Sequence, residues 1–254
     1  QIPVGISTIY TRIETNNNCA GIGTFKVQVY AGPAQNAITP INACQTETII
    51  LANKDSEILA SQTPTVSVSY FNTFDNARTN TAAINKNTAL PLTVGTKAIF
   101  VRQFDMATQC VSVVSFDINV FANPTITTPD PITICGSNTA DFNLDSRIPQ
   151  ITSGNTNYRV FFYETPADLA ADTPITATNP YNSVSKTISV KVVDPTGNNC
   201  FSTTTLRLNV VGSPGSTTNP DIIQACDDSG FYPFNLTQRQ SQMAGTTPLN
   251  TIQF

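Results

Sequence analysis

The chain has 254 residues, more than the roughly 100–200 residues of a typical domain, so its length predicts two or three modules. Its 13 basic and 17 acidic side chains give a net charge of −4, which argues against the clustered cations that nucleic-acid binding requires. Histidine is absent, and so are a glycine-rich phosphate loop and a Gly-x-Ser-x-Gly motif, so we expect no enzyme.

Taken in chain order, the first predicted elements are two strands, at residues 9–13 and 25–29, in which apolar side chains tend to alternate with polar ones. The polar residues 16–19 between them predict a hairpin turn. The same strand, turn and strand return at residues 99–103 and 116–120, and again at residues 188–192 and 206–210. Each predicted hairpin has a cysteine at or just past its turn.

The cysteines follow two registers of one repeat. The hairpin cysteines Cys19, Cys110 and Cys200 lie 91 and 90 residues apart. The others are Cys44, Cys135 and Cys226, and each lies 91 residues from the next. Since the residues around the cysteines recur as well, the sequence predicts tandem copies of one module.

The repeat divides the chain into four parts. Two complete modules, residues 34–124 and 125–214, lie between the C-terminal part of a module (1–33) and the N-terminal part of another (215–254). About seven short strands in roughly 90 residues predict an all-β fold of tandem Ig-like β-sandwich modules in a linear array. Because residue 1 falls close to a predicted strand, we expect the export signal and the anchor to lie elsewhere.

Disulfides are the predicted role of the cysteines, and they indicate an oxidising compartment at the cell surface or outside the cell. Two pairings respect the repeat. The bonds within modules join Cys44 with Cys110 and Cys135 with Cys200, leaving Cys19 and Cys226 to modules outside the chain. The bonds across boundaries join Cys19 with Cys44, Cys110 with Cys135 and Cys200 with Cys226.

The expected topology favours the bonds within modules. The last hairpin turn should lie where the chain enters a module, and the next module should begin at the opposite end, one strand length away. A bond across the boundary would then span about 20 Å, against a Cα limit of about 7 Å.

Three further groups of residues are candidate binding sites. Asp227, Asp228, Ser229 and Gly230 could offer oxygens to calcium, although this is also ordinary turn chemistry, and we expect no cofactor. Arg12, Arg102 and Lys191 recur at one strand position and could form a ligand stripe, or pack their stems over the sheet. In the aromatic pairs Tyr70-Phe71 and Phe162-Tyr163, one ring should lie in the core, which leaves the other for sugar contact.

Several motifs resemble repeats of giant Bacteroidetes surface proteins, in particular SprB-type gliding-motility adhesins. They are residues 226–231 followed by 234–237, residues 162–168, and residues 99–102 leading to Cys110. The resemblance covers essentially the whole chain. It implies type IX secretion, outer-membrane attachment and a role in carrying an adhesive region along the cell surface.

The sequence therefore predicts an extracellular stalk of structural repeats, with neighbouring modules of the same chain as partners. The gliding and secretion machinery would be contacted through regions outside this chain. In the alternative function, the repeats themselves bind polysaccharide or protein ligands, and accessory proteins could pair with exposed edge strands.

Overall fold

The computed structural model describes residues 1–16, 19–60, 62–212, 221–226 and 230–244. It divides into a first unit, Gln1–Pro124 with Asp194–Phe201, and a second unit, Thr125–Val193 with Ser202–Phe254. The unit boundaries differ from those of the predicted modules, because residues 1–33 and the turn of the last hairpin both join the first unit. Among the described helices, none combines the length and hydropathy needed to cross a bilayer.

The first unit is built on one four-stranded sheet. Its strands, in spatial order, are β3 (Ile41–Cys44), β6 (Val111–Phe121), β5 (Gly95–Asp105) and β4 (Val66–Phe71). β5 pairs antiparallel with β4 and β6, whereas the short β3 runs parallel to β6. Within this sheet, the strand that comes first in the sequence therefore lies beside the one that comes last.

Alternation along the strands explains the core of this unit. Ile99 and Val101 on β5, and Phe116 and Ile118 on β6, point to one side of the sheet and are buried. They pack against Leu51 and neighbouring apolar side chains of the segment that follows β3. The strands predicted from period-two patterns in this unit are confirmed.

Short helices cover the sheet where the sequence predicted only strands and turns. They are the 3₁₀ turn η1 (Leu51–Lys54) and the α-helices α1 (Asp55–Leu59) and α2 (Phe74–Thr79). The Thr73 side chain caps α2 by accepting from the backbone N–H of Asn76. The helices take the place of some of the seven strands expected in each module.

The second unit has the same plan, and side chains of a smaller additional sheet contribute to its core. The four-stranded sheet is β7 (Ile132–Cys135), β12 (Cys200–Val211), β11 (Lys186–Asp194) and β9 (Arg159–Tyr163), with β7 parallel to β12. The smaller sheet is β8 (Ala140–Phe142) with β10 (Tyr181–Ser183). The connecting helices are η2 (Leu144–Arg147), α3 (Ile148–Ile151) and α4 (Pro166–Ala170). In the first unit a single bridge between Ile50 and Ala89 stands in place of the smaller sheet.

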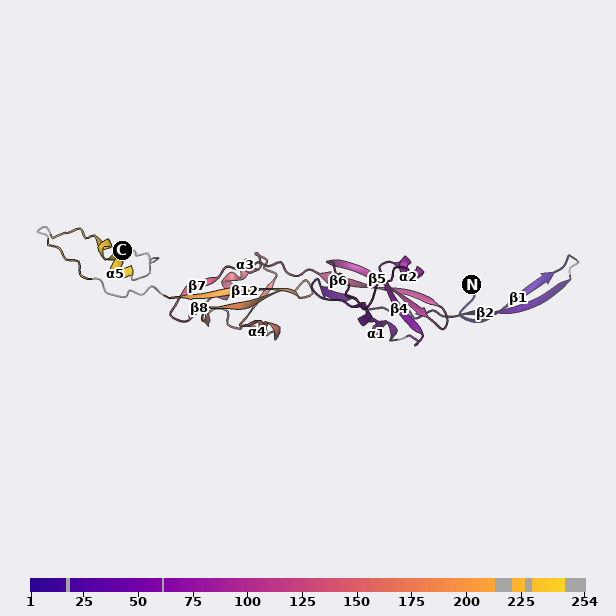
Figure 1. Cartoon of the computed structure of the whole chain (residues 1–254). Helices are drawn as coiled ribbons and strands as arrows, with labels where there is room; N and C mark the ends of the chain where they lie inside the picture. Colours follow the sequence, from indigo (N-terminus) through magenta and orange to yellow (C-terminus); the bar gives the residue numbers. More distant parts are fainter. Residues whose placement is uncertain (17–18, 61, 213–220, 227–229, 245–254) are drawn as a thin grey trace. The chain divides into compact units, whose positions relative to one another are not determined.

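Two further pieces flank the sandwiches along the chain. The strands β1 (Gly5–Glu14) and β2 (Ala20–Val29) lie side by side as an antiparallel hairpin (Figure 1). The 3₁₀ turn η3 (Leu236–Arg239) and the helix α5 (Gln240–Ala244) follow the second sandwich in the sequence. The chain is thus an array of Ig-like β-sandwich repeats, and the predicted fold class is confirmed.

Candidate functional site

One disulfide joins the two repeats covalently. Cys44 is the last residue of β3, and Cys200 is the first residue of β12, in the hairpin turn of the following repeat. Their Cα atoms lie 5.5 Å apart, and the bond closes a loop with a sequence separation of 156 residues. Both cysteines belong to the first compact unit, since the turn of the β11–β12 hairpin is part of it.

The predicted bond between Cys44 and Cys110 is wrong because the two residues lie at opposite ends of the same sheet. β3 runs parallel to β6 and places Cys44 beside Phe121, at the end of β6. Cys110 precedes Val111 at the start of that strand. Eleven strand residues separate the two ends, about 35 Å at 3.3 Å per residue, far beyond the reach of a disulfide.

The predicted bond between Cys135 and Cys200 is wrong for the same reason. β7 runs parallel to β12 and pairs Cys135 with Val211 at the end of that strand, whereas Cys200 begins it. The alternative bonds of Cys44 with Cys19 and of Cys200 with Cys226 are also wrong, since Cys44 and Cys200 pair with each other.

Four cysteines keep free thiols: Cys19, Cys110, Cys135 and Cys226. This contradicts the alternative bond between Cys110 and Cys135. Cys110 occupies in its repeat the position of Cys200, and Cys135 occupies the position of Cys44. The bonds expected for Cys19 and Cys226 to modules outside the chain stay predictions.

The hairpin turn that carries Cys200 is held by its own hydrogen bonds. Asp194 Oδ1 accepts from the hydroxyl of Thr196 at 2.6 Å and from its backbone N–H at 2.9 Å. The Thr196 hydroxyl bond, supported by backbone N–H groups, lowers the pKa of the Asp194 carboxyl. Asn198 and Asn199 follow with φ of 58° and 56°, the left-handed region that asparagine tolerates well.

The backbone also positions Cys200 directly. Its N–H donates to the carbonyl of Gly197 at 3.0 Å, which closes the turn just before β12. The carbonyl of the next residue, Phe201, accepts from the Asn123 side chain of the first repeat. Cys200 therefore lies on an ordered turn, which holds it in a fixed position for the bond with Cys44.

The recurring cations serve local structure rather than a ligand stripe. Arg102 donates through Nη1 to the carbonyls of Ala77 and Arg78 at the end of α2. Lys191 donates to Asp172 at 2.9 Å, and Arg12 pairs with Glu14. Each cation is bound to groups of its own repeat.

The aromatic pairs offer no sugar platform, so this prediction is wrong. Tyr70, Phe71, Phe162 and Tyr163 are all fully buried or nearly so. The expectation failed because α2 contacts β4 and α4 contacts β9, so the outer face of each of these strands has a helix against it. The helix signal was present in Thr165, which starts a Thr-x-x-Asp capping motif in front of α4.

The candidate calcium ligands Asp227, Asp228 and Ser229 lie outside the described residues. Within the ranges that the structure describes, no three cysteine or acidic side chains gather as a possible metal site.

Buried tyrosine hydroxyls fasten loops to the sheets through carboxylates that also bind lysine. The three sets are Tyr70 with Asp55 and Lys86, Tyr163 with Asp172 and Lys191, and Tyr181 with Glu164 and Lys186. Burial raises the pKa of Tyr70 and Tyr163 above the usual value, and their hydrogen-bonded carboxylates add to this. These hydroxyls thus stay protonated and act as donors.

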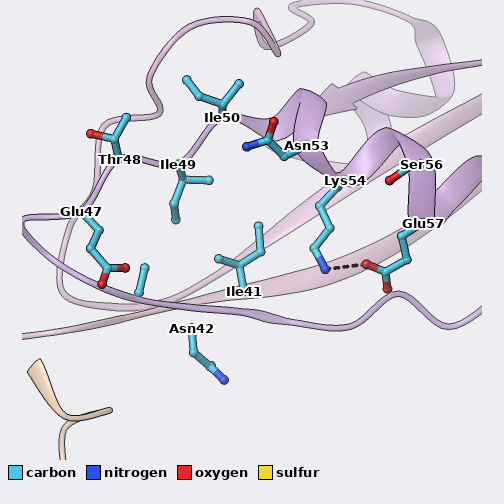
Figure 2. A pocket seen from close by; sticks show the side chains of 11 residues that line it. Ile41, Asn42, Glu47, Thr48, Ile49, Ile50, Asn53, Lys54, Ser56 and Glu57 are labelled. Atoms are coloured by element: carbon cyan, nitrogen blue, oxygen red, sulfur yellow. Dashed lines mark hydrogen bonds and ion pairs between the residues drawn. The ribbon is translucent and has the colours of Figure 1, made fainter.

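A hollow of about 410 Å³ lies beside β3, η1 and α1 (Figure 2). Its apolar wall comes from Ile41 and Ile49, and its polar rim includes Glu47, Lys54 and Glu57. Lys54 Nζ lies 2.6 Å from Glu57 Oε2, the contact dashed in Figure 2. No aromatic side chain lines the hollow, so it lacks the stacking surface that sugars favour.

Glu57 ties the segment before β3 to α1. Its Oε1 accepts from the backbone N–H of Thr39 at 2.6 Å, while Oε2 accepts from Lys54. The bond from Lys54, followed by that from Thr39, lowers the pKa of the carboxyl to about 2.

We expect Glu57→Gln to lower the melting temperature at pH 7 by a few degrees. The substitution removes the ion pair with Lys54 and weakens the link between α1 and the segment before β3. The pKa of the Glu57 carboxyl is lower in the folded state than in the unfolded state, so the ionised carboxylate stabilises the fold at pH values above the unfolded pKa of 4.5. This contribution disappears as the pH falls towards about 2. The difference from wild type, measured by thermal unfolding, should therefore shrink between these pH values. Glu47→Gln, in the same hollow, is the control and should change little at either pH.

Residues 39–125 and 131–214 match the protein-family model described as Flavobacterium inter-domain disulphide bond domain. No curated protein sequence matches the chain.

Solved structures of similar fold include an I-band fragment from titin, with 12% identity over 76% of this chain and 70% of that chain, at a TM-score of 0.33. Another is a SusE-like surface polysaccharide-binding protein of the Bacteroides thetaiotaomicron heparin utilisation locus, with 10% identity, 81% and 43% coverage, and a TM-score of 0.31. These likenesses concern the fold alone.

Proposed function

Because the chain belongs to the Flavobacterium inter-domain disulphide bond domain family, we propose that it is a structural segment of an extracellular filament whose repeats are joined by disulfides. Tension along such a filament would pass through covalent bonds between repeats. The function would reside in length and linkage, without catalysis.

The observation that carries this proposal is the span of the bond between Cys44 and Cys200. The sequence separation of 156 residues includes most of both complete repeats. A pull on the chain that arrives at Cys44 is transferred through the sulfur atoms to Cys200. The residues between them then bear little of the pull.

The repeat extends the same linkage in both directions. Cys135 holds the place of Cys44 and is exposed, while Cys110 holds the place of Cys200 and is partly exposed. By the same rule, Cys135 pairs with the hairpin cysteine of a following repeat, and Cys110 with the first-strand cysteine of a preceding one. Cys19 and Cys226 would likewise bond to further repeats. Successive bonds then overlap, and each repeat is tied to both neighbours.

The setting of the filament follows from the disulfide and the resemblance. A disulfide persists in an oxidising compartment, which supports an extracellular or cell-surface location. The resemblance to SprB-type adhesins supports a stalk in gliding motility, exported by the type IX system and held at the outer membrane. The gliding machinery would contact other regions of the protein.

A second candidate function is ligand binding by the repeats themselves. The hollow with the Lys54 and Glu57 rim favours it, because polar groups converge there on an apolar floor. In that case the purified chain would be retained on agar or surface polysaccharide, whereas a stalk segment would pass through.

The stalk proposal is tested by locating this segment on cells that produce the protein. Ser153 and Gly154 are exposed and lie in a turn after α3, outside the strands of both sheets, so a short epitope inserted there should leave both sheets intact. Electron microscopy with a gold-labelled antibody should place the epitope along the filament, between the membrane and the tip. Label found only at the distal end would contradict the stalk.

A further inference from the structure

The strand β3 has one edge without a partner strand. β6 pairs with its other edge, and among the strands that the structure describes β3 is the outermost on that side of its sheet. Successive residues of a strand direct their backbone N–H and C=O groups to opposite edges. Because the N–H of Gln45 donates to the carbonyl of Phe121 at 2.9 Å, the backbone groups of Ala43 also point to β6. Those of Asn42 and Cys44 therefore point to the unpaired edge.

Most of the backbone groups at this edge have no protein partner. The carbonyl of Cys44 accepts from the N–H of Glu47 at 2.9 Å. Within the described ranges of the chain, no protein group bonds to the N–H or the C=O of Asn42, and this residue is exposed. Free donors and acceptors on a strand edge are the groups with which an added strand pairs.

The hollow beside β3, η1 and α1 opens along this same edge. Figure 2 shows that the side chain of Asn42 points away from the hollow, and its Oδ1 accepts from the side chain of Asn119 at 2.8 Å. Asn42 nevertheless lines the hollow, so it does so with its backbone. Ile41 and Ile49 form the apolar wall above that backbone. Free backbone groups and an apolar hollow thus adjoin each other.

The second repeat has larger side chains at the equivalent positions. Ile134 stands where the first repeat has Ala43, and Phe142 stands where it has Ile49. Both belong to the packed core of the second unit. With its smaller side chains, the first repeat keeps a hollow of about 410 Å³, within the roughly 300–1,000 Å³ of ligand pockets.

The charge that the rim leaves for a ligand is negative. Lys54 is already bound to Glu57 and to the carbonyl of Thr39. Glu47 is exposed, and none of the ion pairs in the described part of the chain includes it. A basic side chain of a ligand would therefore complement this rim.

We propose that an extended peptide of a partner protein adds as a strand to the free edge of β3 and places an aliphatic side chain in the hollow. The peptide residue opposite Asn42 exchanges two N–H···O bonds with it, as in an antiparallel pair. A lysine or arginine of the peptide lies near Glu47. This assignment rests on the second candidate function, ligand binding by the repeats, and is independent of the stalk.

A nuclear magnetic resonance titration of the oxidised full chain tests this assignment. The probe is the capped heptapeptide Thr-Lys-Val-Lys-Val-Lys-Thr, in which both valines lie on one face of an extended strand. At millimolar peptide, the amide signals of Asn42 and Ile49 should shift, and exchange of the Asn42 amide proton should slow. The same peptide with glutamate in place of each lysine should bind more weakly, because its charge repels that of Glu47.

Two substitutions of Asn42 separate its backbone from its side chain. Asn42→Pro removes the free N–H but no bond to β6, and proline is tolerated on an edge strand where the N–H faces away from the sheet. It should weaken peptide binding at least about fivefold, the factor that one net hydrogen bond contributes. Asn42→Ala loses the same bond to Asn119 but keeps the N–H, and should bind as the wild type does.

A third variant tests the hollow itself. Ala43→Ile gives the first repeat the residue that the second repeat carries at this position, so the fold should accept it. The larger side chain takes up room that the peptide valine needs, and the shifts of Asn42 and Ile49 on adding peptide should disappear. Unchanged amide signals along β5 and β6 would show that the sheet is intact.

Unshifted Asn42 and Ile49 signals at millimolar peptide would overturn the proposal, and so would equal binding by Asn42→Pro and Asn42→Ala. Retention of the chain on agar without any peptide shift would also overturn it, while the second candidate function would stand. Failure of both tests would remove that function as well. The stalk would survive each of these results, since it rests on the bond between Cys44 and Cys200.

Discussion

Stretching the oxidised chain from its two ends should yield a contour length about 550 Å shorter than stretching the reduced chain. The disulfide removes a sequence separation of 156 residues from the stretched path, and an extended residue spans at most about 3.6 Å. Single-molecule force spectroscopy with and without a reductant measures this difference directly. In the oxidised chain, the segments outside the loop should extend, while the residues between Cys44 and Cys200 should not.

Two double variants make the measurement specific. Cys44→Ser with Cys200→Ser should give the long contour without any reductant. Cys110→Ser with Cys135→Ser removes two thiols that form no bond within the chain, and should leave the short contour unchanged. If this control also lengthened the contour, Cys110 or Cys135 would take part in a bond within the chain, and the proposed linkage of successive repeats would fail.

The hairpins and their core positions could be predicted from sequence because the information is local. Alternating apolar residues around Ile99 and Phe116 define two strands and the buried face, and the polar turn between them defines the hairpin. The spacing of the repeat also showed which cysteines occupy the same position in successive repeats. Nothing further is needed to predict the last two strands of each repeat.

The disulfide could not be predicted in this way because it depends on the direction of a short strand. Only the parallel pairing of β3 with β6 places Cys44 beside Phe121, away from Cys110. A four-residue strand carries no signal for this choice, and both predicted pairings join cysteines that are consecutive in the sequence. The actual bond reaches from the first strand of one repeat to the last hairpin of the next.

The helices were missed for a different reason. α2 and α4 have six and five residues, too short for an apolar stripe of helical period to emerge. Their effect is large nonetheless. They lie against β4 and β9, and in each of these strands the sequence predicted that one ring of the aromatic pair would face solvent. Thr73 and Thr165, as capping residues, were the available signals.

Removing the disulfide should also lower the free energy of unfolding of the linked repeats. In the chain-entropy model, closing a loop of this length constrains the unfolded chain and contributes about 5 kcal/mol. Cys44→Ser with Cys200→Ser should therefore shift the urea midpoint strongly downwards. The slope of the transition should become steeper, since an unfolded chain without the cross-link exposes more surface.

The matched variant, Cys110→Ser with Cys135→Ser, separates the bond from the loss of thiols. It removes the same number of sulfur atoms from equivalent repeat positions, one at a hairpin turn and one at the end of a first strand. Its urea midpoint should stay close to that of the wild type, and adding a reductant should then lower it to that of Cys44→Ser with Cys200→Ser. Equal midpoints for the two double variants in the absence of reductant would mean that the bond does not stabilise the repeats. The filament would then owe its resistance to stretching to the sandwich cores, which non-covalent packing alone would have to hold against the pull.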